Sequence, residues 1–353
     1  MKILIITQKY NINDSNLGVF IDWWDKLAER LEKIYVLALE KHSEPTAPNM
    51  KVISMGKEKG AGFLGKFFGF YAGLLKIIGK SDAVLVHMIP KYVVLAAPVA
   101  FFYRKPIFMW YTGVALHWQL RLAVLFCRKV FTAHEAAMRI NTTKRIITGH
   151  GIDIEKFKYQ ISNIKNNDEI VIISVGRITP SKQHDFIIRA VADLIKSGYN
   201  VKLKIIGGII QKYHREYFEY LKRMAKDLKI GGKIEFSGSV SYDKMPAYLQ
   251  NSDILINAVS FGGLDKVVLE AMASGVVPLT SNAAFKNVFP EEIAEGLIFE
   301  QDSEKNLKLK LKNVLDGCLY QNAFLAQKLR EVVVKNHNLD NLIPRLVKEI
   351  SAP

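Results

Sequence analysis

Residues 169–195, EIVIISVGRITPSKQHDFIIRAVADLI, contain the pattern that decides the fold. The stretch begins with a β-branched run that is typical of a buried strand, and this run ends at Gly176. From Asp185 onward the apolar residues recur at helical spacing, so a helix is expected after the strand. A strand, a short loop and a helix in this order form the repeating unit of an α/β fold with a parallel sheet.

The same alternation extends in both directions along the chain. The runs that predict strands are KILIIT, IYVLAL, KVISM, AVLVH, PIFMW, KVFTA and KRIIT in the first half, and EIVIISV, VKLKIIG, KIEFSG, DILINA and GVVPLT in the second. Segments of helical length lie between most of them, which indicates parallel sheets covered by helices on both faces. Because 353 residues suit two domains of about 150 to 180 residues each, we predict two doubly wound α/β domains.

The boundary between these domains is expected in residues 149–168, where glycines give way to a polar stretch rich in asparagine. We place it at Ile164, which gives an N-terminal domain of residues 1–164 and a C-terminal domain of residues 165–353. A last helix, at about residues 339–351, is a candidate to pack back on the N-terminal domain.

Composition limits the class of protein. Hydrophobic residues make up 49% of the chain and charged residues 24%, which is typical of a soluble globular protein. Only two cysteines are present, Cys127 and Cys318, so a disulfide framework is excluded and a reducing cytoplasm fits. The apolar stretch at the amino terminus is too short for a secretion signal, and residues 92–103 fall short of the roughly 18 to 20 residues of a spanning helix. We therefore expect a cytoplasmic protein without a transmembrane segment.

The net charge of +15 is concentrated in one half of the chain. Residues 1–165 contain 24 Lys and Arg against 12 Asp and Glu, whereas residues 166–353 contain 25 against 22. Such a basic field attracts the phosphates of a substrate, an anionic membrane or a nucleic acid. No nucleic-acid-binding module or arginine-rich arm is present, so we expect no nucleic-acid partner. A dehydrogenase is disfavoured because no Gly-x-Gly-x-x-Gly follows the first strand.

The loop after the strand EIVIISV contains the first candidate site. Arg177 stands at the carboxyl end of the strand, and Lys182 follows where Ser181 is able to cap the next helix. Ligands of open α/β sheets bind at this edge, and a guanidinium, an ammonium and free helix N–H groups together suit a diphosphate. The alternative is that both cations are merely solvated, and position alone does not decide between the two interpretations.

The stretch SFGGLDKVVLEAMASGVVPLTS contains a second candidate site. Gly262 and Gly263 open a turn before a short helix, at about residues 266–273. Glu270 is surrounded by apolar neighbours in that helix, and a buried carboxylate needs donors, which either ribose hydroxyls or an internal partner would supply. Asp265 stands where a helix N-cap belongs, so capping explains it as well as a contact with substrate does.

These motifs resemble family 4 glycosyltransferases of the GT-B type, which are retaining enzymes that use a nucleotide-activated sugar. GRITPSK is similar to the phosphate clamp of the family, FGGLDKVVLEAMASGVVPLTS to its donor-site helix, and GHGIDIEKF to its interdomain hinge signature. The resemblance implies that Arg177 and Lys182 grip the donor diphosphate and that Glu270 accepts hydrogen bonds from the ribose. It implies a donor site formed by Gly176, Arg177, Lys182, Gly262, Gly263, Leu264, Asp265 and Glu270.

In the N-terminal domain, which is expected to bind the acceptor, the chain resembles the family only in its general pattern. Gly18 resembles the glycine of the substrate loop in the first domain of the family. His87 and His117 are candidates to orient an acceptor hydroxyl or the donor phosphate, and His87 completes the expected catalytic set with Arg177 and Lys182. Each histidine also has a purely structural interpretation.

Two departures from the family bear on the chemistry. The family usually has two acidic residues separated by seven others, and here Gly262 stands at the first position, so Asp265 is the candidate to replace it. In the retaining reaction the donor's own phosphate is thought to take the acceptor proton, so a protein base need not be present. Residues 153–155 form an Asp-x-Asp/Glu pattern, but they belong to the hinge signature, so we expect no metal.

Residues 55–80, MGKEKGAGFLGKFFGFYAGLLKIIGK, stand apart in the basic half. Their aromatic residues recur at helical spacing with lysines at the flanks, which is typical of a helix in an anionic membrane interface. The alternative is a domain helix whose aromatic face is core and whose glycines allow close packing. The basic charge of the first half of the chain slightly favours the membrane interpretation.

We therefore predict two Rossmann-like domains facing across a cleft and the activity of a retaining, hexosyltransferase-type glycosyltransferase. The expected partners are a nucleotide sugar as donor and a glycan or lipid-linked acceptor in cell-envelope polysaccharide or glycolipid synthesis. We expect no metal or other cofactor and a cytoplasmic location, with the inner face of the cell membrane as a candidate site of peripheral association. The alternative is an inactive sugar-nucleotide-binding protein of the same fold, which the missing acid at Gly262 supports.

Overall fold

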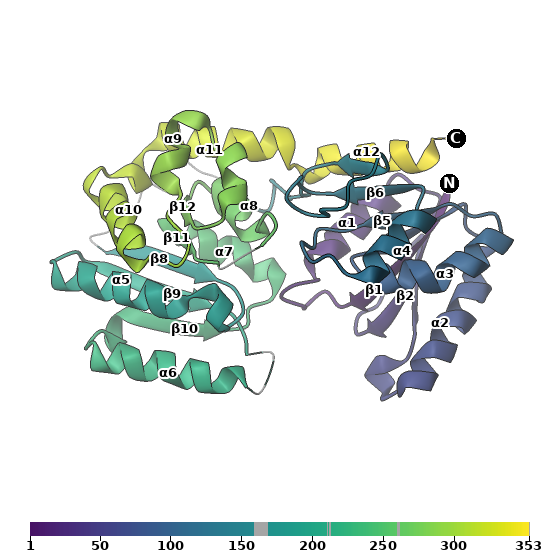
Figure 1. Cartoon of the computed structure of the whole chain (residues 1–353), viewed down its shortest axis with the longest axis horizontal. Coiled ribbons are helices and arrows are strands. Elements are labelled where there is room, and N and C mark those ends of the chain that lie inside the picture. Colours follow the sequence, from purple (N-terminus) through teal and green to yellow (C-terminus); the bar gives the residue numbers. More distant parts are fainter. Residues whose placement is uncertain (159–168, 210, 212, 260–261, 353) are drawn as a thin grey trace. The chain divides into compact units, whose positions relative to one another are not determined.

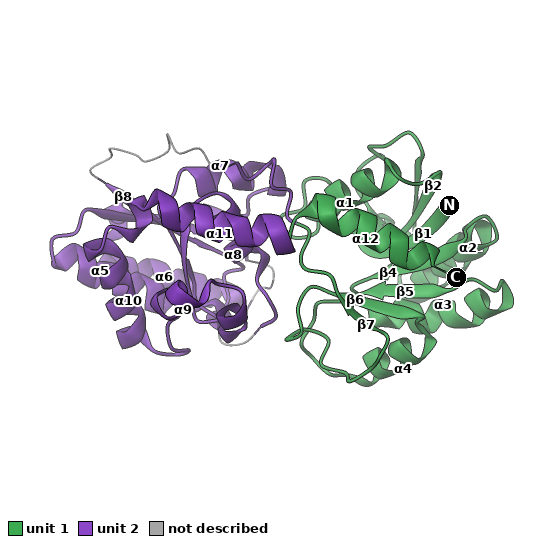
Figure 2. Ribbon diagram, turned by 90° about the horizontal axis from the view of Figure 1, so that it is seen from above, with its two compact units in different colours: residues 1–151, 337–353 green, residues 152–336 purple. Residues whose placement is uncertain are grey.

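The computed structural model describes residues 1–158, 169–209, 211, 213–259 and 262–352. The chain forms two compact units (Figure 2): unit 1 is Met1–Gly151 with His337–Pro353, and unit 2 is Ile152–Asn336. The predicted boundary at Ile164 lies outside the described residues. The closing segment belongs to unit 1.

In its described residues, unit 1 contains a seven-stranded sheet of order β3-β2-β1-β4-β5-β6-β7, with every pairing parallel. The strands are β1 (Lys2–Tyr10), β2 (Lys33–Lys41), β3 (Met50–Ser54), β4 (Ala83–His87), β5 (Ile107–Trp110), β6 (Lys129–Thr132) and β7 (Arg145–Ile147). The carboxyl ends of parallel strands share one edge of the sheet, so the loops that follow them lie along that edge.

Helices cover both faces of this sheet. On one face lie α1 (Val19–Ala28) and α12 (Leu339–Ser351), which contact each other. On the other face lie α2 (Phe63–Ile78), α3 (Pro90–Phe102) and α4 (Trp118–Phe126), in that order, with the 3-10 turn η1 (Lys57–Lys59) before α2 (Figure 1). Leu4 and Ile6 belong to the core beneath α2, α3 and α4, in keeping with the two-residue repeat of a strand.

Unit 2 contains, in its described residues, a parallel five-stranded sheet of order β10-β9-β8-β11-β12. The strands are β8 (Ile170–Val175), β9 (Val201–Ile206), β10 (Ile234–Gly238), β11 (Ile254–Asn257) and β12 (Val277–Thr280). The helices are α5 (His184–Lys196), α6 (His214–Asp227), α7 (Met245–Gln250), α8 (Lys266–Ala273), α9 (Glu291–Leu297), α10 (Glu304–Asp316) and α11 (Ala323–Asn336). Short 3-10 turns are η3 (Pro180–Lys182), η4 (Gly231–Lys233), η5 (Tyr242–Lys244), η6 (Ala283–Asn287) and η7 (Leu319–Gln321).

The α/β prediction is confirmed, since each of the twelve predicted runs overlaps a strand in a parallel sheet. The helix predicted over residues 266–273 is α8, and the helix predicted from Asp185 is α5. No helix in the described part of the chain combines the length and the apolar character needed to cross a membrane.

Candidate functional site

The loop after β8 is held by β9 and by the loop that follows β9. The Gly176 N–H donates to the Ile206 carbonyl at 2.9 Å, and the Ile178 N–H donates to Gly208 at 3.1 Å. A Cβ atom at Gly207 would lie 1.7 Å from the Gly176 oxygen, so only glycine allows the loops after β8 and β9 to come this close. Arg177 therefore stands on a loop that is fixed at the carboxyl edge of the sheet.

Arg177 and Lys182 differ in how the protein holds them. The Arg177 side chain is exposed and makes no ion pair with any described residue. The Lys182 side chain is half-buried, and its methylene groups pass about 3.2 Å from the position of a Cβ atom on Gly176. Its ammonium group thus lies beside the same strand end as Arg177, where the sequence predicts the diphosphate clamp.

The expected helix cap at Ser181 is wrong. Residues Pro180–Lys182 form the turn η3, and α5 begins at His184 after Gln183, whose φ of 47° is left-handed. The Ser181 hydroxyl lies 2.8 Å from the Thr179 hydroxyl instead of capping α5. The turn separates Lys182 from the helix, so its position follows from η3 and Gly176 rather than from a helix start.

An ion pair joins Lys182 to the second candidate segment. Lys182 Nζ lies 3.2 Å from Asp265 Oδ1, and Asn282 Nδ2 donates to Asp265 Oδ2 at 3.0 Å. Asp265 occupies the N-cap position of α8 but makes no capping hydrogen bond, so the capping interpretation of its side chain is wrong. The carboxylate instead links Lys182 to the start of α8.

The Asp265 carboxylate also lies beside the position where the family has an acid. A Cβ atom at Gly262 would lie 3.7 Å from Asp265 Oδ2 and 3.9 Å from Asn282 Nδ2. The turn itself is held because Asn282 Nδ2 donates to the Gly263 carbonyl at 2.6 Å, and Leu264 is buried beneath it. Gly262, Gly263, Leu264 and Asp265 are thus brought next to Lys182 within unit 2.

Glu270 is buried on α8, as the sequence predicts, with 5% of the residue exposed. Burial raises the pKa of its carboxyl group to about 7, against the opposing effects of Lys266 and of a hydrogen bond from Tyr242. Tyr242 and Lys266 are therefore internal partners of the Glu270 carboxyl group. The contact of Glu270 with a ribose remains a prediction.

Sequence reasoning missed His184, the first residue of α5. Its Nε2 atom lies 3.3 Å from the carbonyl oxygen of Arg177, and the side chain is fully buried. Burial lowers the pKa of this imidazole to about 4, so it is neutral near pH 7 and able to donate to that carbonyl. In the sequence, His184 reads only as the start of an amphipathic helix, so no local signal marks it.

Gly18 lies at the start of α1, after a tightly coiled loop of unit 1. Its N–H donates to the Asp14 carbonyl at 3.0 Å, and a Cβ atom would lie 2.5 Å from the same oxygen. Only glycine fits this position. The loop after β1 is thus held in one shape at the carboxyl edge of the sheet.

The two candidate histidines of unit 1 have structural partners. His87 ends β4 with 2% of the residue exposed, its Nδ1 atom 3.1 Å from the Thr7 hydroxyl and its ring centroid 4.0 Å from that of Phe20. His117 is the N-cap of α4, and its Nδ1 atom accepts from the Leu120 N–H at 3.2 Å. The geometry favours the structural interpretation of both residues, most strongly for buried His87.

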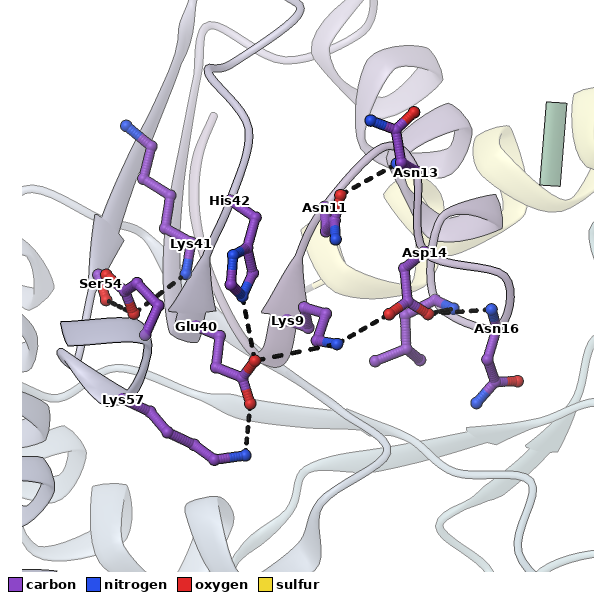
Figure 3. A network of polar contacts seen from close by, with 12 residues as sticks. Lys9, Asn11, Asn13, Asp14, Asn16, Glu40, Lys41, His42, Ser54 and Lys57 are labelled. Atoms are coloured by element: carbon purple, nitrogen blue, oxygen red, sulfur yellow. Dashed lines mark hydrogen bonds and ion pairs between the residues drawn. The ribbon is translucent and has the colours of Figure 1, made fainter. Parts of the chain in front are cut away.

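A charged network lines the carboxyl edge near Gly18 (Figure 3). Lys9 Nζ lies 2.9 Å from Asp14 Oδ2 and 3.8 Å from Glu40 Oε2, and Glu40 also pairs with Lys57 and with His42. Burial disfavours ionisation of Glu40, but hydrogen bonds from Lys57 and His42 outweigh it and hold the pKa of its carboxyl group below the usual value. Each lysine of this network is therefore paired with a carboxylate.

The fold of these units defines a class. HepE of Anabaena, whose crystal structure holds UDP and glucose, matches with a TM-score of 0.80 at 16% identity, over 99% of each chain. Sucrose-phosphate synthase from Thermosynechococcus elongatus matches with a TM-score of 0.79 at 14% identity, over 99% of this chain and 98% of that one. Together with the two parallel sheets, these likenesses confirm the GT-B prediction.

The family follows from the sequence of unit 2. Residues 155–331, half of the chain, match the model described as glycosyl transferases group 1, so the chain belongs to this family. The predicted glycosyltransferase class is thereby confirmed.

Two curated relatives differ in how much of their length is matched. A GDP-Man:Man(3)GlcNAc(2)-PP-Dol alpha-1,2-mannosyltransferase of Dictyostelium discoideum is 28% identical over 121 residues, which are 32% of this chain and 24% of that protein. Protein CapJ of Staphylococcus aureus is 23% identical over 369 residues, covering 95% of this chain and 90% of CapJ. The chain thus spans about a quarter of the mannosyltransferase and most of CapJ.

Proposed function

We propose that the chain is a retaining, family 4 type glycosyltransferase that moves a hexose from a nucleoside diphosphate sugar to a hydroxyl of a glycan or lipid-linked acceptor. The observation that carries this proposal is the pair of cations Arg177 and Lys182 at the carboxyl end of β8, beside the start of α8. Nucleotide sugars in the names and titles of similar proteins support the donor class: GDP-Man for the Dictyostelium enzyme and UDP-glucose in a HepE crystal structure. The dolichol-linked acceptor in the name of the Dictyostelium enzyme supports the acceptor class.

In the proposed reaction, negative charge develops on the leaving diphosphate beside Arg177 and Lys182. The bond between the anomeric carbon and the diphosphate oxygen breaks, and the nucleoside diphosphate leaves with an additional negative charge. The acceptor hydroxyl attacks the anomeric carbon from the same face, and its proton passes to the departing phosphate oxygen. Arg177 and Lys182 stabilise that oxygen, because fixed cations aimed at developing charge lower the barrier. This scheme needs no metal and no protein base.

Asp265 takes the place of the missing acid at Gly262 in this proposal. Its carboxylate is 3.7 Å from the position of a Cβ atom on Gly262, so it occupies space that a longer acidic side chain at residue 262 would reach. There it would accept hydrogen bonds from hydroxyls of the donor sugar. The ion pair with Lys182 would then join the group that holds the sugar to the group that holds the diphosphate.

Glu270 is proposed to accept from the ribose hydroxyls. The Glu270→Gln variant should then weaken binding of a nucleoside diphosphate, because amide NH₂ donors replace part of the acceptor capacity of the carboxylate. Unchanged nucleotide affinity would assign Glu270 to an internal role with Tyr242 and Lys266.

The first test is a thermal-shift screen of the purified chain against UDP, GDP, ADP, dTDP and CMP and their sugar conjugates. A ligand that binds only the folded state raises the melting temperature, so one nucleotide is expected to stand out. Release of the free sugar from the matching conjugate would then report slow transfer to water. Arg177→Ala is the matched variant, and the proposal fails if no nucleotide shifts the wild type or if the variant is shifted equally.

A further inference from the structure

The outer side of α2, α3 and α4 is unusually apolar. Fourteen large hydrophobic residues are exposed among the described residues of unit 1, and twelve of them belong to these helices or lie within two residues of their ends. We call these twelve the apolar face: Phe63, Leu64, Phe67, Phe68, Leu75, Phe101, Phe102, Tyr103, Leu116, Trp118, Leu125 and Phe126. The described part of unit 2 exposes four such residues, which lie on three different helices or beside them.

The core of unit 1 does not use these side chains. In α2, the residues Phe70, Leu74 and Ile77 pack into the core, while Phe63 and Phe68 are 70% and 66% exposed. Gly69 and Gly73 also face inward, since Cβ atoms there would lie 2.6 Å from the Met55 carbonyl oxygen and 2.5 Å from Leu37. The glycines therefore allow the close packing that the core interpretation predicts, whereas the exposed aromatic residues are not part of the core.

The charge around the apolar face has one sign. Residues 60–128 contain eight lysines and arginines and a single acidic residue, Asp82. The Asp82 carboxylate accepts a hydrogen bond from the backbone N–H of Lys2 at 2.7 Å. Within α2, α3 and α4 themselves the charged residues are Lys66, Lys76, Lys91 and Arg121. An apolar surface with only cations among its charges complements a surface that is apolar inside and anionic at its rim.

A hollow in this face has the same character. It measures about 250 Å³ and lies between the end of α3 and the end of α4, where Phe101 and Phe126 form part of its wall. Lys105 and Arg128 also line it. Apolar walls beside two cations suit an acyl chain with an anionic headgroup above it.

We infer that the apolar face docks on a lipid bilayer that contains anionic lipids. The aromatic side chains enter the interface, and the lysines and arginines contact the phosphate groups of the lipids. The positive charge of the apolar face favours a lipid surface as its partner and disfavours a second copy of this chain. Two copies of a surface whose charges are all cationic would repel each other. The inference does not depend on the identity of the sugar donor.

The test is sedimentation of the full chain with vesicles of phosphatidylcholine, with and without phosphatidylglycerol. The wild type is expected to sediment with the mixed vesicles, and added salt should release it, because salt screens the cations. Phe63→Ser combined with Phe68→Ser should weaken binding by about tenfold or more, since two aromatic side chains no longer enter the apolar region. Lys66→Gln combined with Lys76→Gln should weaken it and flatten its dependence on salt.

The matched control is Tyr213→Ser combined with Phe324→Ser, two aromatic residues of unit 2 that are each 67% exposed. This variant should bind as the wild type does, and all variants should keep the wild-type melting temperature because each changed side chain is on the surface or only half-buried. The inference is overturned if the wild type ignores mixed vesicles, or if the Phe63 and Phe68 variant binds them equally well. It is also overturned if the wild type without lipid is a dimer that this variant converts to a monomer, because the face would then be a contact between copies.

Discussion

The carboxyl edges of the two sheets carry similar charged residues but use them differently. At the edge of unit 2, Arg177 makes no ion pair with any described residue, and Lys182 pairs with one carboxylate, that of Asp265. At the edge of unit 1, Lys9 and Lys57 pair with Asp14 and Glu40. The first edge has cationic charge left for an anionic ligand, whereas the second offers polar groups with little net charge, which suits a ligand that binds through hydroxyls. The counter-ions of its loops thus leave the same α/β unit with a charged edge in one case and a nearly neutral edge in the other.

The largest effect is expected from removing the cations of unit 2. Lys182→Ala and Arg177→Ala should each lower turnover by well over tenfold, because one charge contact in the transition state contributes roughly 2 to 4 kcal/mol. Steady-state sugar transfer measures this, and urea unfolding should show folded variants. Lys222→Ala, which removes a surface lysine of α6 paired with Glu219, is the control and should leave turnover unchanged. Full activity of both clamp variants would remove the distinction between the two edges.

Acid should destabilise both units by the same means. His184 in unit 2 and His337 in unit 1 are buried, and burial lowers the pKa of each imidazole to about 4; His134 contributes to the effect at His337. His184 lies next to the Arg177 carbonyl, and His337 accepts from the His150 N–H at 3.1 Å, so each binds the backbone of a loop. Unfolded histidine has a pKa of about 6.5, so between pH 6.5 and pH 4 the unfolded chain binds more protons than the folded one.

The free energy of unfolding should therefore be highest above pH 6.5 and fall as the pH is lowered towards 4. Each histidine contributes on the order of 3 kcal/mol to this loss. Urea unfolding at a series of pH values measures it. His184→Gln and His337→Gln should each flatten the curve, and a wild-type stability that is constant from pH 7 to pH 4 would contradict the assignment of both as neutral buried groups.

Asp265 gives a sharper test of the unit 2 edge. Asp265→Asn removes the counter-ion of Lys182, so a nucleoside diphosphate without a sugar should bind as well as before or better. Turnover of the nucleotide sugar should nevertheless fall by about tenfold, because a charged hydrogen-bond acceptor for the sugar is lost. Isothermal titration and a transfer assay on the same preparation separate the two effects.

The matched variant moves the acid back to the position that the family uses. Gly262→Glu combined with Asp265→Gly should recover part of the turnover, since a Cβ atom at Gly262 would lie at ordinary van der Waals distance from Asp265 and Asn282. A loss of nucleotide affinity in Asp265→Asn, with no recovery in the double variant, would assign Asp265 to shaping the loop only.

The fold was predictable because its strands are short, β-branched and separated by amphipathic stretches, so each one shows in the local sequence. The proximity of Arg177 and Lys182 was predictable for a similar reason, because both lie within one loop directly after such a strand. His184 and Asn282 were not, because their contacts with the Arg177 carbonyl and with Asp265 depend on how separate strands meet at one edge. Ser181 was misjudged as a cap because the turn η3 and a left-handed Gln183 delay the start of the helix to His184.

The helix α2 shows what the spacing of apolar residues predicts and what it does not. The spacing correctly predicts a helix, but it groups Phe63 and Phe67 with Phe70 on one aromatic face, and the structure buries only Phe70. The buried residues of α2 all lie from Phe70 onward, so α2 packs on the sheet mainly through its second half. Its first turn is therefore exposed. Which part of an amphipathic helix touches the sheet is a tertiary property, and a repeat in the sequence does not encode it.

The smallest effect is expected from the edge of unit 1. Glu40→Gln removes the carboxylate shared by Lys9, His42 and Lys57, and exposed or half-exposed ion pairs contribute only about 0.2 to 1 kcal/mol each. The KM for the acceptor should therefore rise a few-fold, while the thermal shift produced by the nucleotide stays that of the wild type. Glu44→Gln, which removes an 84% exposed carboxylate paired with Lys41, is the control and should leave both values unchanged. If Glu40→Gln instead changes nucleotide affinity and spares the acceptor KM, then the donor also depends on the edge of unit 1, and the division of labour between the two edges is wrong.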